Sequence, residues 1–315
     1  MRARKGSVGL IVFYGLLMVL CWQTPAHAAS IPPTIDQIVG TYSVNDAETW
    51  YEFDVGLPGK TRYALTWHIT QTSESTVQVY IDEWDWLFTA YYKNGFLVQS
   101  SGNVSSGTAF WGALGIATFS GKPGKVKFKG DFGWGQFGSG WNGDEYWEWD
   151  PYSGKMTSAG PGSTVGAARA GQGDEQAASA PGEGEVPLAI GSHPSIDDLP
   201  GTYSCTLART VYSLTAGTKE KEKEPDTLTI TKIDDSTLNL HSSGGDMYTH
   251  YGSGVLMLAN VDNDTLVPDA LLGLLLAKGK PGKISLKGKV HSVSELETPN
   301  ERFVISTVSC KQSSP

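Results

Sequence analysis

The sequence of 315 residues lacks the signatures of the common catalytic and metal sites. It has no G-x-S-x-G elbow, no glycine-rich phosphate loop and no H-E-x-x-H motif, so the enzyme classes that use them are not indicated. His241, His250 and His291 are scattered without the spacing of metal ligands. We therefore predict a protein that is not an enzyme and has no metal or cofactor. One alternative stays open, because carboxylates such as Asp82 and Glu148 could flank a glycosidic bond.

Basic residues are also in short supply. The chain carries 24 Lys and Arg against 33 Asp and Glu, which gives a formal net charge of -9. Nucleic acids are bound through clustered Lys and Arg. We therefore expect no nucleic-acid partner, whereas a small-molecule ligand or a protein partner in the cell envelope remains compatible with this charge.

Long apolar runs are missing beyond the first few dozen residues. The run Gly9 to Leu20 follows three basic residues within the first five positions, and Ala26-His27-Ala28 follows it. This order is typical of an export signal that is cleaved between Ala28 and Ala29. No later stretch approaches the roughly 18 apolar residues of a membrane span. We predict a secreted or periplasmic protein with a signal at 1–28 and no membrane span in the mature form.

Cysteine is scarce as well. The chain has three, and one of them, Cys21, lies inside the predicted signal. The two that remain, Cys205 and Cys310, are in a chain predicted to enter an oxidising compartment. Two cysteines there are most simply a disulfide.

The sequence does contain a repeat. Gly40-Thr41-Tyr42-Ser43 returns as Gly201-Thr202-Tyr203-Ser204, at a spacing of 161 residues. The same spacing gives 17 identities over the 47 pairs that start at Pro33/Pro194 and end at Val79/Leu240. Such agreement predicts one small domain present in two copies.

The two copies are separated by a segment of different composition. Residues 153–191 are mostly Gly, Ala, Ser, Pro and Glu, with no aromatic residue. Such a composition cannot bury enough apolar surface to offset the entropy of ordering the chain. The predicted domains are therefore repeat 1 at 31–151, a disordered linker at 152–192 and repeat 2 at 193–312.

Each copy has the pattern of an all-β domain. Residues 62–71 and 76–82 are rich in β-branched and aromatic residues and predict two strands, with counterparts at 227–232 and 237–241. The stretch from Val267 to Leu276 is compatible with a short helix or a buried strand.

A second pair of matching segments predicts a turn followed by a half-buried strand. The sequence Gly-Lys-Pro-Gly-Lys occurs at 121–125 and again at 279–283. Pro followed by Gly suits the central positions of a type II turn, because Pro has a fixed negative φ and Gly tolerates a positive one. After the first turn Val126 and Phe128 alternate with lysines, which predicts one buried and one solvated face.

The number of such segments indicates a closed sheet. We count seven to nine strands in each copy, and closure into a barrel removes the exposed edges of a sheet. Cys205 lies in the first strand of its copy and Cys310 in the last, so a disulfide would join the two strands that meet at closure. The first copy has no such pair. The predicted fold is two tandem small antiparallel β-barrels, with two β-sandwiches as the alternative.

The opening of each copy resembles a known family. The Gly-x-aromatic pattern of Gly40 to Tyr42 and of Gly201 to Tyr203, followed by a strand meander, is similar to the lipocalin and calycin barrels. Lipocalins usually have Trp where Tyr42 and Tyr203 stand. The resemblance implies cup-shaped barrels, of which at least one binds a small, largely apolar molecule.

Tryptophan distinguishes the copies, because every Trp after the signal lies in the first one. These side chains could simply fill a core, form a protein-binding patch, or line a pocket for a sugar ring, a flat apolar molecule or a cation held by π faces and carboxylates. The candidate ligand-binding residues are Trp67, Trp84, Trp86, Trp111, Trp134, Trp141, Trp147 and Trp149.

Two of the Trp pairs alternate with acids. Trp84 and Trp86 alternate with Glu83 and Asp85, and the run 145–150 places Trp147 and Trp149 between acids. Because neighbouring strand residues point to opposite faces, we expect the Trp side chains to face the pocket and the acids to face solvent. The glycine-rich stretch 132–143 between these clusters predicts a loop, which either folds back onto the barrel mouth or closes over a ligand.

These observations predict an exported, non-enzymatic binding protein with a Trp-rich pocket in its first repeat. The alternative is a structural or partner-binding envelope protein without a small-molecule ligand.

Overall fold

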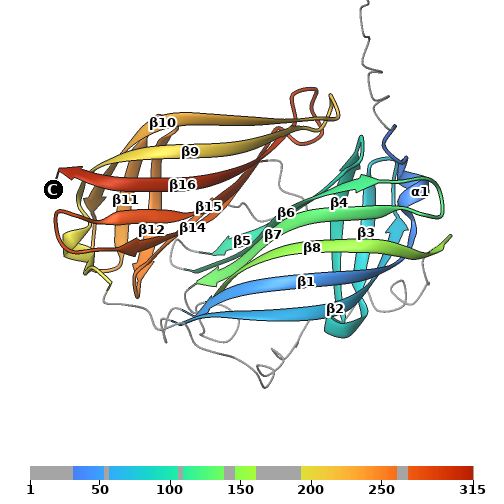
Figure 1. The fold of residues 1–315 in the computed structure, drawn as a ribbon, viewed down its shortest axis with the longest axis horizontal. Coiled ribbons are helices and arrows are strands. Elements are labelled where there is room, and N and C mark those ends of the chain that lie inside the picture. Colours follow the sequence, from blue (N-terminus) through green and yellow to red (C-terminus); the bar gives the residue numbers. More distant parts are fainter. Residues whose placement is uncertain are drawn as a thin grey trace, which may run out of the picture. The chain divides into compact units, whose positions relative to one another are not determined.

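The structure, a computed structural model, describes residues 31–52, 57–105, 109–137, 146–160, 193–260 and 269–314. Residues 32–315 form one compact unit. Within it the chain forms two closed antiparallel barrels of eight strands each (Figure 1). The prediction of two tandem β-barrels is confirmed, and the sandwich alternative is wrong. No helix in the described ranges is long and apolar enough to cross a membrane.

The first barrel begins with the short helix α1 (Ile35–Ile38) and has a 3₁₀ turn, η1 (Asp82–Trp84), between its third and fourth strands. Its strands are β1 (Gly40–Glu52), β2 (Leu57–Gln71), β3 (Thr76–Ile81), β4 (Trp86–Lys93), β5 (Phe96–Ser105), β6 (Ala109–Ser120), β7 (Lys127–Phe137) and β8 (Tyr146–Ala159).

The second barrel begins with the 3₁₀ turn η3 (Ile196–Asp198), at the place that α1 has in the first. Its strands are β9 (Gly201–Ser213), β10 (Thr218–Lys232), β11 (Thr237–Ser242), β12 (Gly245–Gly252), β13 (Val255–Asn260), β14 (Ala270–Lys278), β15 (Ser285–Ser294) and β16 (Arg302–Ser314). The ambiguous stretch before the second Pro-Gly turn is thus a strand from Ala270 onward, and residues 261–268 lie outside the described ranges.

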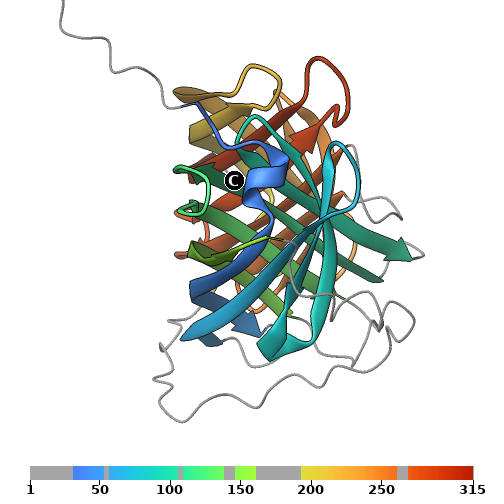
Figure 2. The same ribbon diagram turned by 90° about the vertical axis from the view of Figure 1, so that its right-hand side faces the viewer.

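The repeated Gly-Thr-Tyr-Ser motif opens both barrels and fastens the preceding turn to the core. Tyr42 is fully buried and its hydroxyl donates a hydrogen bond to the carbonyl oxygen of Ile38 at 2.7 Å. Tyr203 is equally buried and donates to the carbonyl oxygen of Leu199 at the same distance. In the first barrel α1 therefore covers one end of the strands (Figure 2). The resemblance between the two copies thus corresponds to a shared way of closing one barrel end.

The turns behave as their residues predict. The amide of Lys125 donates to the carbonyl oxygen of Lys122 at 2.9 Å, and Gly124 has φ +73°. The second copy repeats this between Lys283 and Lys280, with Gly282 at φ +74°. Positive φ at the residue after Pro is the requirement of a type II turn, and Gly meets it without steric cost.

Three segments differ from the prediction. The segment 82–86 is not one strand, because η1 lies at Asp82–Trp84 and Asp85 adopts a left-handed conformation before β4 begins. The first half of the predicted glycine-rich loop is part of β7, and residues 138–145 lie outside the described ranges. β8 continues to Ala159, beyond the predicted start of the linker at 152, because its backbone pairs with both β1 and β7. Residues 161–192 of the predicted linker are not described.

The two barrels are closed in different ways. In the first, β1 pairs with β8 from Gly40 opposite Ala159 to Glu52 opposite Tyr146, without a covalent link. In the second, Cys205 of β9 lies directly opposite Cys310 of β16 and the two form the predicted disulfide. The disulfide closes a loop with a sequence separation of 105 residues. Because this loop is long, the disulfide removes a large amount of conformational entropy from the unfolded chain.

We expect the double variant Cys205→Ala/Cys310→Ala to destabilise the second barrel by about 5 kcal/mol, the chain-entropy value for a loop of this length. Hydrogen exchange followed by mass spectrometry measures the stability of each barrel separately. Exchange should accelerate in β9 to β16 and stay unchanged in β1 to β8. Equal acceleration in both barrels, or none, would contradict this account.

Candidate functional site

An aromatic wall lines part of the interior of the first barrel. Trp67 on β2 is 6% exposed and stacks on Phe128 of β7, with ring centroids 5.2 Å apart. Trp86 at the start of β4 lies 5.0 Å from Phe88 and 5.9 Å from Phe132, and it is half-buried. These rings come from strands far apart in sequence and meet because the sheet closes on itself.

Carboxylates share this interior. Asp46 and Glu48 on β1 are 5% and 7% exposed, and Asp150 on β8 is 3% exposed. Asp46 lies opposite Tyr152 of β8 in the strand register, and Asp150 lies opposite Phe132 of β7. The acids of β1 and β8 are therefore among the interior aromatic rings.

The expectation that the acids of β8 face solvent is wrong. Trp147 and Trp149 do alternate with Glu148 and Asp150, but the acids occupy the inner face and the Trp side chains the outer one. The reason lies in the neighbouring strand, where Gly133 is opposite Trp149 and Gly135 opposite Trp147. A Cβ atom at either glycine would lie within 2.5 Å of an indole ring, so both indoles lie flat against the outer face of β7.

Trp147 and Trp149 belong to a separate hydrophobic cluster. Trp147 is fully buried, and Trp149 has its ring centroid 4.4 Å from that of His291 on β15. His291 Nδ1 lies 3.0 Å from the carbonyl oxygen of Leu114 on β6, and this cluster includes Leu114 and residues of both barrels. These two Trp side chains thus do not line the interior of the first barrel.

The other candidate residues divide as follows. Trp67, Trp84 and Trp86 line one small interior cavity, whereas Trp134 is half-buried against the same core. Trp141 lies outside the described residues, and only the backbone of Trp111, in β6, belongs to them.

The cavity has a volume of about 20 Å³, which is room for one group of the size of a water molecule. Its lining is aromatic on most sides and acidic on one. The lining residues are Asp46, Trp67, Ile81, Trp84, Trp86, Phe88, Gln99, Phe132, Asp150 and Tyr152.

Four buried polar atoms on this lining have no hydrogen-bond partner among the described residues. They are Oδ1 of Asp46, Oδ1 of Asp150, Nε1 of Trp67 and Nε2 of Gln99. An unpaired buried polar atom costs about 1–3 kcal/mol of stability, and a charged one costs more. Two acceptors and two donors around one cavity therefore indicate an occupant that can pair with both kinds.

The electrostatics of the interior follow from burial and like charge. Burial raises the pKa of Asp46 from its ordinary 3.8 to about 7, and the negative charge of Glu48 adds to the effect. Burial also raises the pKa of Asp150 well above its ordinary value. The negative charges of Glu148 and Asp46 raise it further. Burial raises the pKa of Tyr63 to about 12, with Glu48 as the next cause. The charged groups that act on these carboxyls are all acids.

The second barrel lacks this arrangement. At the position of Trp67 it has Leu228, and where Asp46 faces Tyr152 across the closing strands, it has Leu207 facing Val308. All three of these residues belong to a buried core of apolar side chains and the disulfide. The polar interior is thus a property of the first copy alone.

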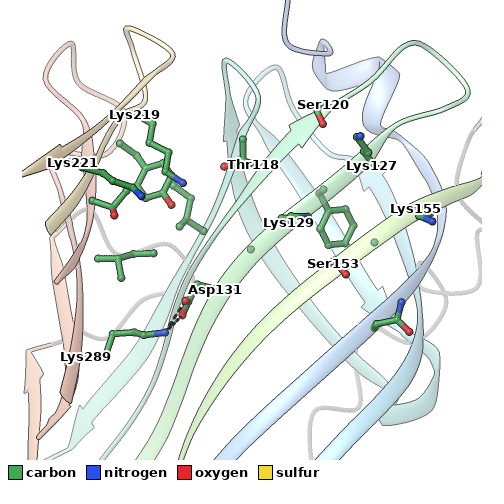
Figure 3. A pocket seen from close by; sticks show the side chains of 18 of the residues that line it. Thr118, Ser120, Lys127, Lys129, Asp131, Ser153, Lys155, Lys219, Lys221 and Lys289 are labelled. Atoms are coloured by element: carbon green, nitrogen blue, oxygen red, sulfur yellow. Dashed lines mark hydrogen bonds and ion pairs between the residues drawn. The ribbon is translucent and has the colours of Figure 1, made fainter. Parts of the chain in front are cut away.

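A much larger hollow of about 1030 Å³ lies on the outer faces of the strands, lined by residues of both repeats (Figure 3). Lys289 of β15 forms an ion pair with Asp131 of β7 in it, with Nζ 2.7 Å from Oδ2. The pKa of Asp131 is lowered from its ordinary value, because the contributions of His291 and Lys289 outweigh the opposing effect of burial. The hollow is lined by five further lysines, and we call it the lysine groove. They are Lys127, Lys129, Lys155, Lys219 and Lys221.

Sequence reasoning missed this groove. Its lysines come from four strands, and the acidic net charge of the chain obscured them. The one available signal was the alternation of Lys125, Lys127 and Lys129, which showed a basic strand face but not what lies opposite it.

Within the described ranges, no three His, Cys, Asp or Glu side chains are placed to hold a metal ion. Of the two acids considered for a glycosidase, Asp82 is exposed and pairs with His68 at 2.8 Å, whereas Glu148 lies in the register opposite Trp134 and beside the interior acids. The structure therefore does not bring these two carboxylates to one site.

Comparison with known proteins adds little. No protein-family model and no curated protein sequence matches the chain. A protein of unknown function from the DUF3598 family of Nostoc punctiforme is similar at 11% identity and a TM-score of 0.28, over 88% of this chain and 96% of that one. The translocator domain of the autotransporter NalP from Neisseria meningitidis gives 9% identity and a TM-score of 0.12, over 86% and 87%. Likenesses at these scores carry no argument.

The buried acids predict an unusual dependence of stability on pH. A carboxyl whose pKa is raised in the folded state binds its proton more tightly there, so its contribution is full below its unfolded pKa near 3.8 and is lost as pH rises through about 7. The first barrel should therefore be less stable at pH 8 than at pH 5, by roughly 1–3 kcal/mol. Denaturant unfolding followed by Trp fluorescence measures it, because every Trp after the predicted signal lies in the first repeat of the sequence.

Asp46→Asn should flatten that dependence, since an amide cannot ionise. Glu74→Gln, which removes an exposed carboxylate between β2 and β3, serves as the control for net charge and should keep the slope of the native protein. A first barrel that is equally stable at both pH values would show that the interior carboxyls are not perturbed.

Proposed function

We propose that this protein is an exported binding protein whose first barrel holds a small molecule in its aromatic and acidic interior. The second barrel is a companion domain closed by a disulfide. The observation that carries the proposal is the set of four unpaired buried polar atoms around one cavity in the first barrel. A core that served stability alone would be apolar there, as it is in the second barrel.

We include in this proposal that the two barrels are related to the lipocalins. Two eight-stranded barrels with one end covered support it, and so do a Gly-x-Tyr opening and an interior cavity. The small size of the cavity means that a ligand larger than water enters only if side chains move. Trp84 and Trp86 are the ones to move, because they are the only lining residues that are not buried.

The neutral, flat fluorophore N-phenyl-1-naphthylamine tests whether the barrel admits a guest. We expect a saturable rise in its emission, and Trp86→Phe should weaken binding about threefold to tenfold, because one aromatic contact is worth about 0.5–1.5 kcal/mol. Trp149→Phe is the matched control on the outer face and should leave the affinity unchanged. If Trp149→Phe weakens binding and Trp86→Phe does not, the guest lies outside the barrel.

A second candidate function is the binding of an acidic protein partner in the lysine groove. The observation that favours it is the gathering of six lysines around one hollow in an otherwise acidic chain. A concave surface lined by one sign of charge attracts ligands of the opposite sign and accelerates their association.

Poly-L-glutamate is a suitable probe of this groove. Binding should weaken steeply with salt, and Lys127→Glu/Lys129→Glu should reduce it about tenfold or more, because like charges oppose each other across an interface. Lys278→Glu/Lys280→Glu makes the same charge change at exposed positions away from the groove lining and should have a much smaller effect. Equal losses for both variants would mean that net charge, not the groove, determines binding.

A further inference from the structure

The interior of the first barrel contains acceptors that nothing in the described protein satisfies. Oδ1 of Asp46 and Oδ1 of Asp150 lack partners, although both residues are at least nine-tenths buried. Both line the same cavity. Buried acceptors of this kind are retained when something outside the chain pairs with them.

The missing partner is cationic. The titratable groups that face Asp46 and Asp150 are Glu48 on β1, Tyr63 on β2, and Glu148 and Tyr152 on β8. β7 adds Asp131, whose charge acts through the wall although its side chain pairs on the outer face. The cavity lining, with residues from β1, β2, β3, η1, β4, β5, β7 and β8, includes no Lys, Arg or His. Acids buried together without a counter-charge repel each other, and a bound cation relieves that repulsion.

The size and lining of the cavity favour an ammonium group over other cations. About 20 Å³ is room for a group of the size of water, which –NH₃⁺ is and a quaternary ammonium is not. Trp86 and Phe88 add aromatic rings to the lining, and the face of an aromatic ring attracts cations. A metal ion is disfavoured, because the described residues offer no group of three ligands.

The two unpaired donors add a second requirement. Nε1 of Trp67 and Nε2 of Gln99 both need an acceptor on the occupant. A hydroxyl oxygen on the carbon next to the one that carries the ammonium supplies an acceptor. The ammonium alone fills the cavity, so the hydroxyl reaches Trp67 and Gln99 only when Trp84 and Trp86 move aside. The rest of such a molecule must leave the cavity past the half-buried side chains of Trp84 and Trp86, which suit an aromatic or apolar tail.

We infer that the ligand of the first barrel is a small amino alcohol with a primary ammonium group and an apolar or aromatic tail. The ammonium group lies between Asp46 and Asp150, and the hydroxyl oxygen accepts from Trp67 and Gln99. This inference rests on the proposed function and specifies the ligand class of the same site. The competing occupant is one buried water molecule, which also offers donors and acceptors.

Three probes that differ in one group each test the inference on the full-length mature protein. They are 2-amino-1-phenylethanol, its neutral counterpart 1-phenylethane-1,2-diol, and 2-phenylethylamine, which lacks the hydroxyl. Isothermal titration calorimetry should show the amino alcohol binding about tenfold or more tightly than the diol, because the diol leaves the buried carboxylates without a counter-ion. The amine without the hydroxyl should lie between them.

Matched variants locate the binding. Asp46→Asn and Asp150→Asn should each weaken the amino alcohol about tenfold or more and leave the diol nearly unchanged. Glu74→Gln makes a comparable charge change in an exposed turn and should affect neither probe. Because the Asn variants remove buried charge, they should remain folded, and Trp fluorescence checks this.

The dependence of binding on pH is an independent readout. The ammonium pairs with an ionised carboxylate, whereas Asp46 of the empty barrel is protonated below about pH 7. Binding should therefore release protons, and the affinity should rise with pH between 5 and 8, by up to about tenfold per pH unit below the pKa. In Asp46→Asn this slope should fall.

The outcomes separate the inference from the proposed function. If the diol and the amino alcohol bind equally tightly, the barrel is a ligand-binding site but the cation inference is wrong. If N-phenyl-1-naphthylamine binds inside the barrel and none of the three probes does, the inference is again overturned while the proposed function stands. If no probe of either kind binds, a buried water is the occupant and both fail.

Discussion

Closure of each sheet is the constraint on which the rest of this structure depends. Once β1 pairs with β8, every strand has two neighbours, and alternate residues of each strand must enter the interior. The buried Tyr42 and Tyr203 fasten the preceding turns to the barrel ends and so fix where each first strand begins. From that starting point the register determines which side chains face inward, including Asp46 and Asp150.

The two copies share this fold but differ in what fills the barrel interior. The second barrel fills its interior with leucine and isoleucine side chains and joins its closing strands by a disulfide. The first barrel has no disulfide and places acids at the corresponding closure, between β1 and β8. The covalent link thus belongs to the copy with the apolar interior, and the copy with buried charge relies on a long antiparallel pairing.

Buried carboxyls without counter-ions lower stability, and natural proteins depart from the rules of core packing chiefly at functional sites. Eight buried side-chain atoms of the described residues lack a hydrogen-bond partner, and four of them share one site. The unpaired atoms of Asp46, Trp67, Gln99 and Asp150 surround one cavity, whereas the matched region of the second barrel is apolar. The lysine groove is a separate feature on the outer faces, where Lys289 pairs with Asp131 and Lys219 lies over the ring of Tyr212. Its clustered positive charge attracts anions.

The sequence by itself determined the duplication, the all-β class, the type II turns at the Pro-Gly pairs and the disulfide between Cys205 and Cys310. Each of these depends on local chemistry or on identity between copies, which can be read along one chain. It also determined that Trp147 and Trp149 share a face opposite Glu148 and Asp150. Only the tertiary structure decided which of those faces is inside, because alternation along a strand is symmetric. The glycines of β7 offer the indoles a flat surface on the outside, and closure with β1 turns the acids inward.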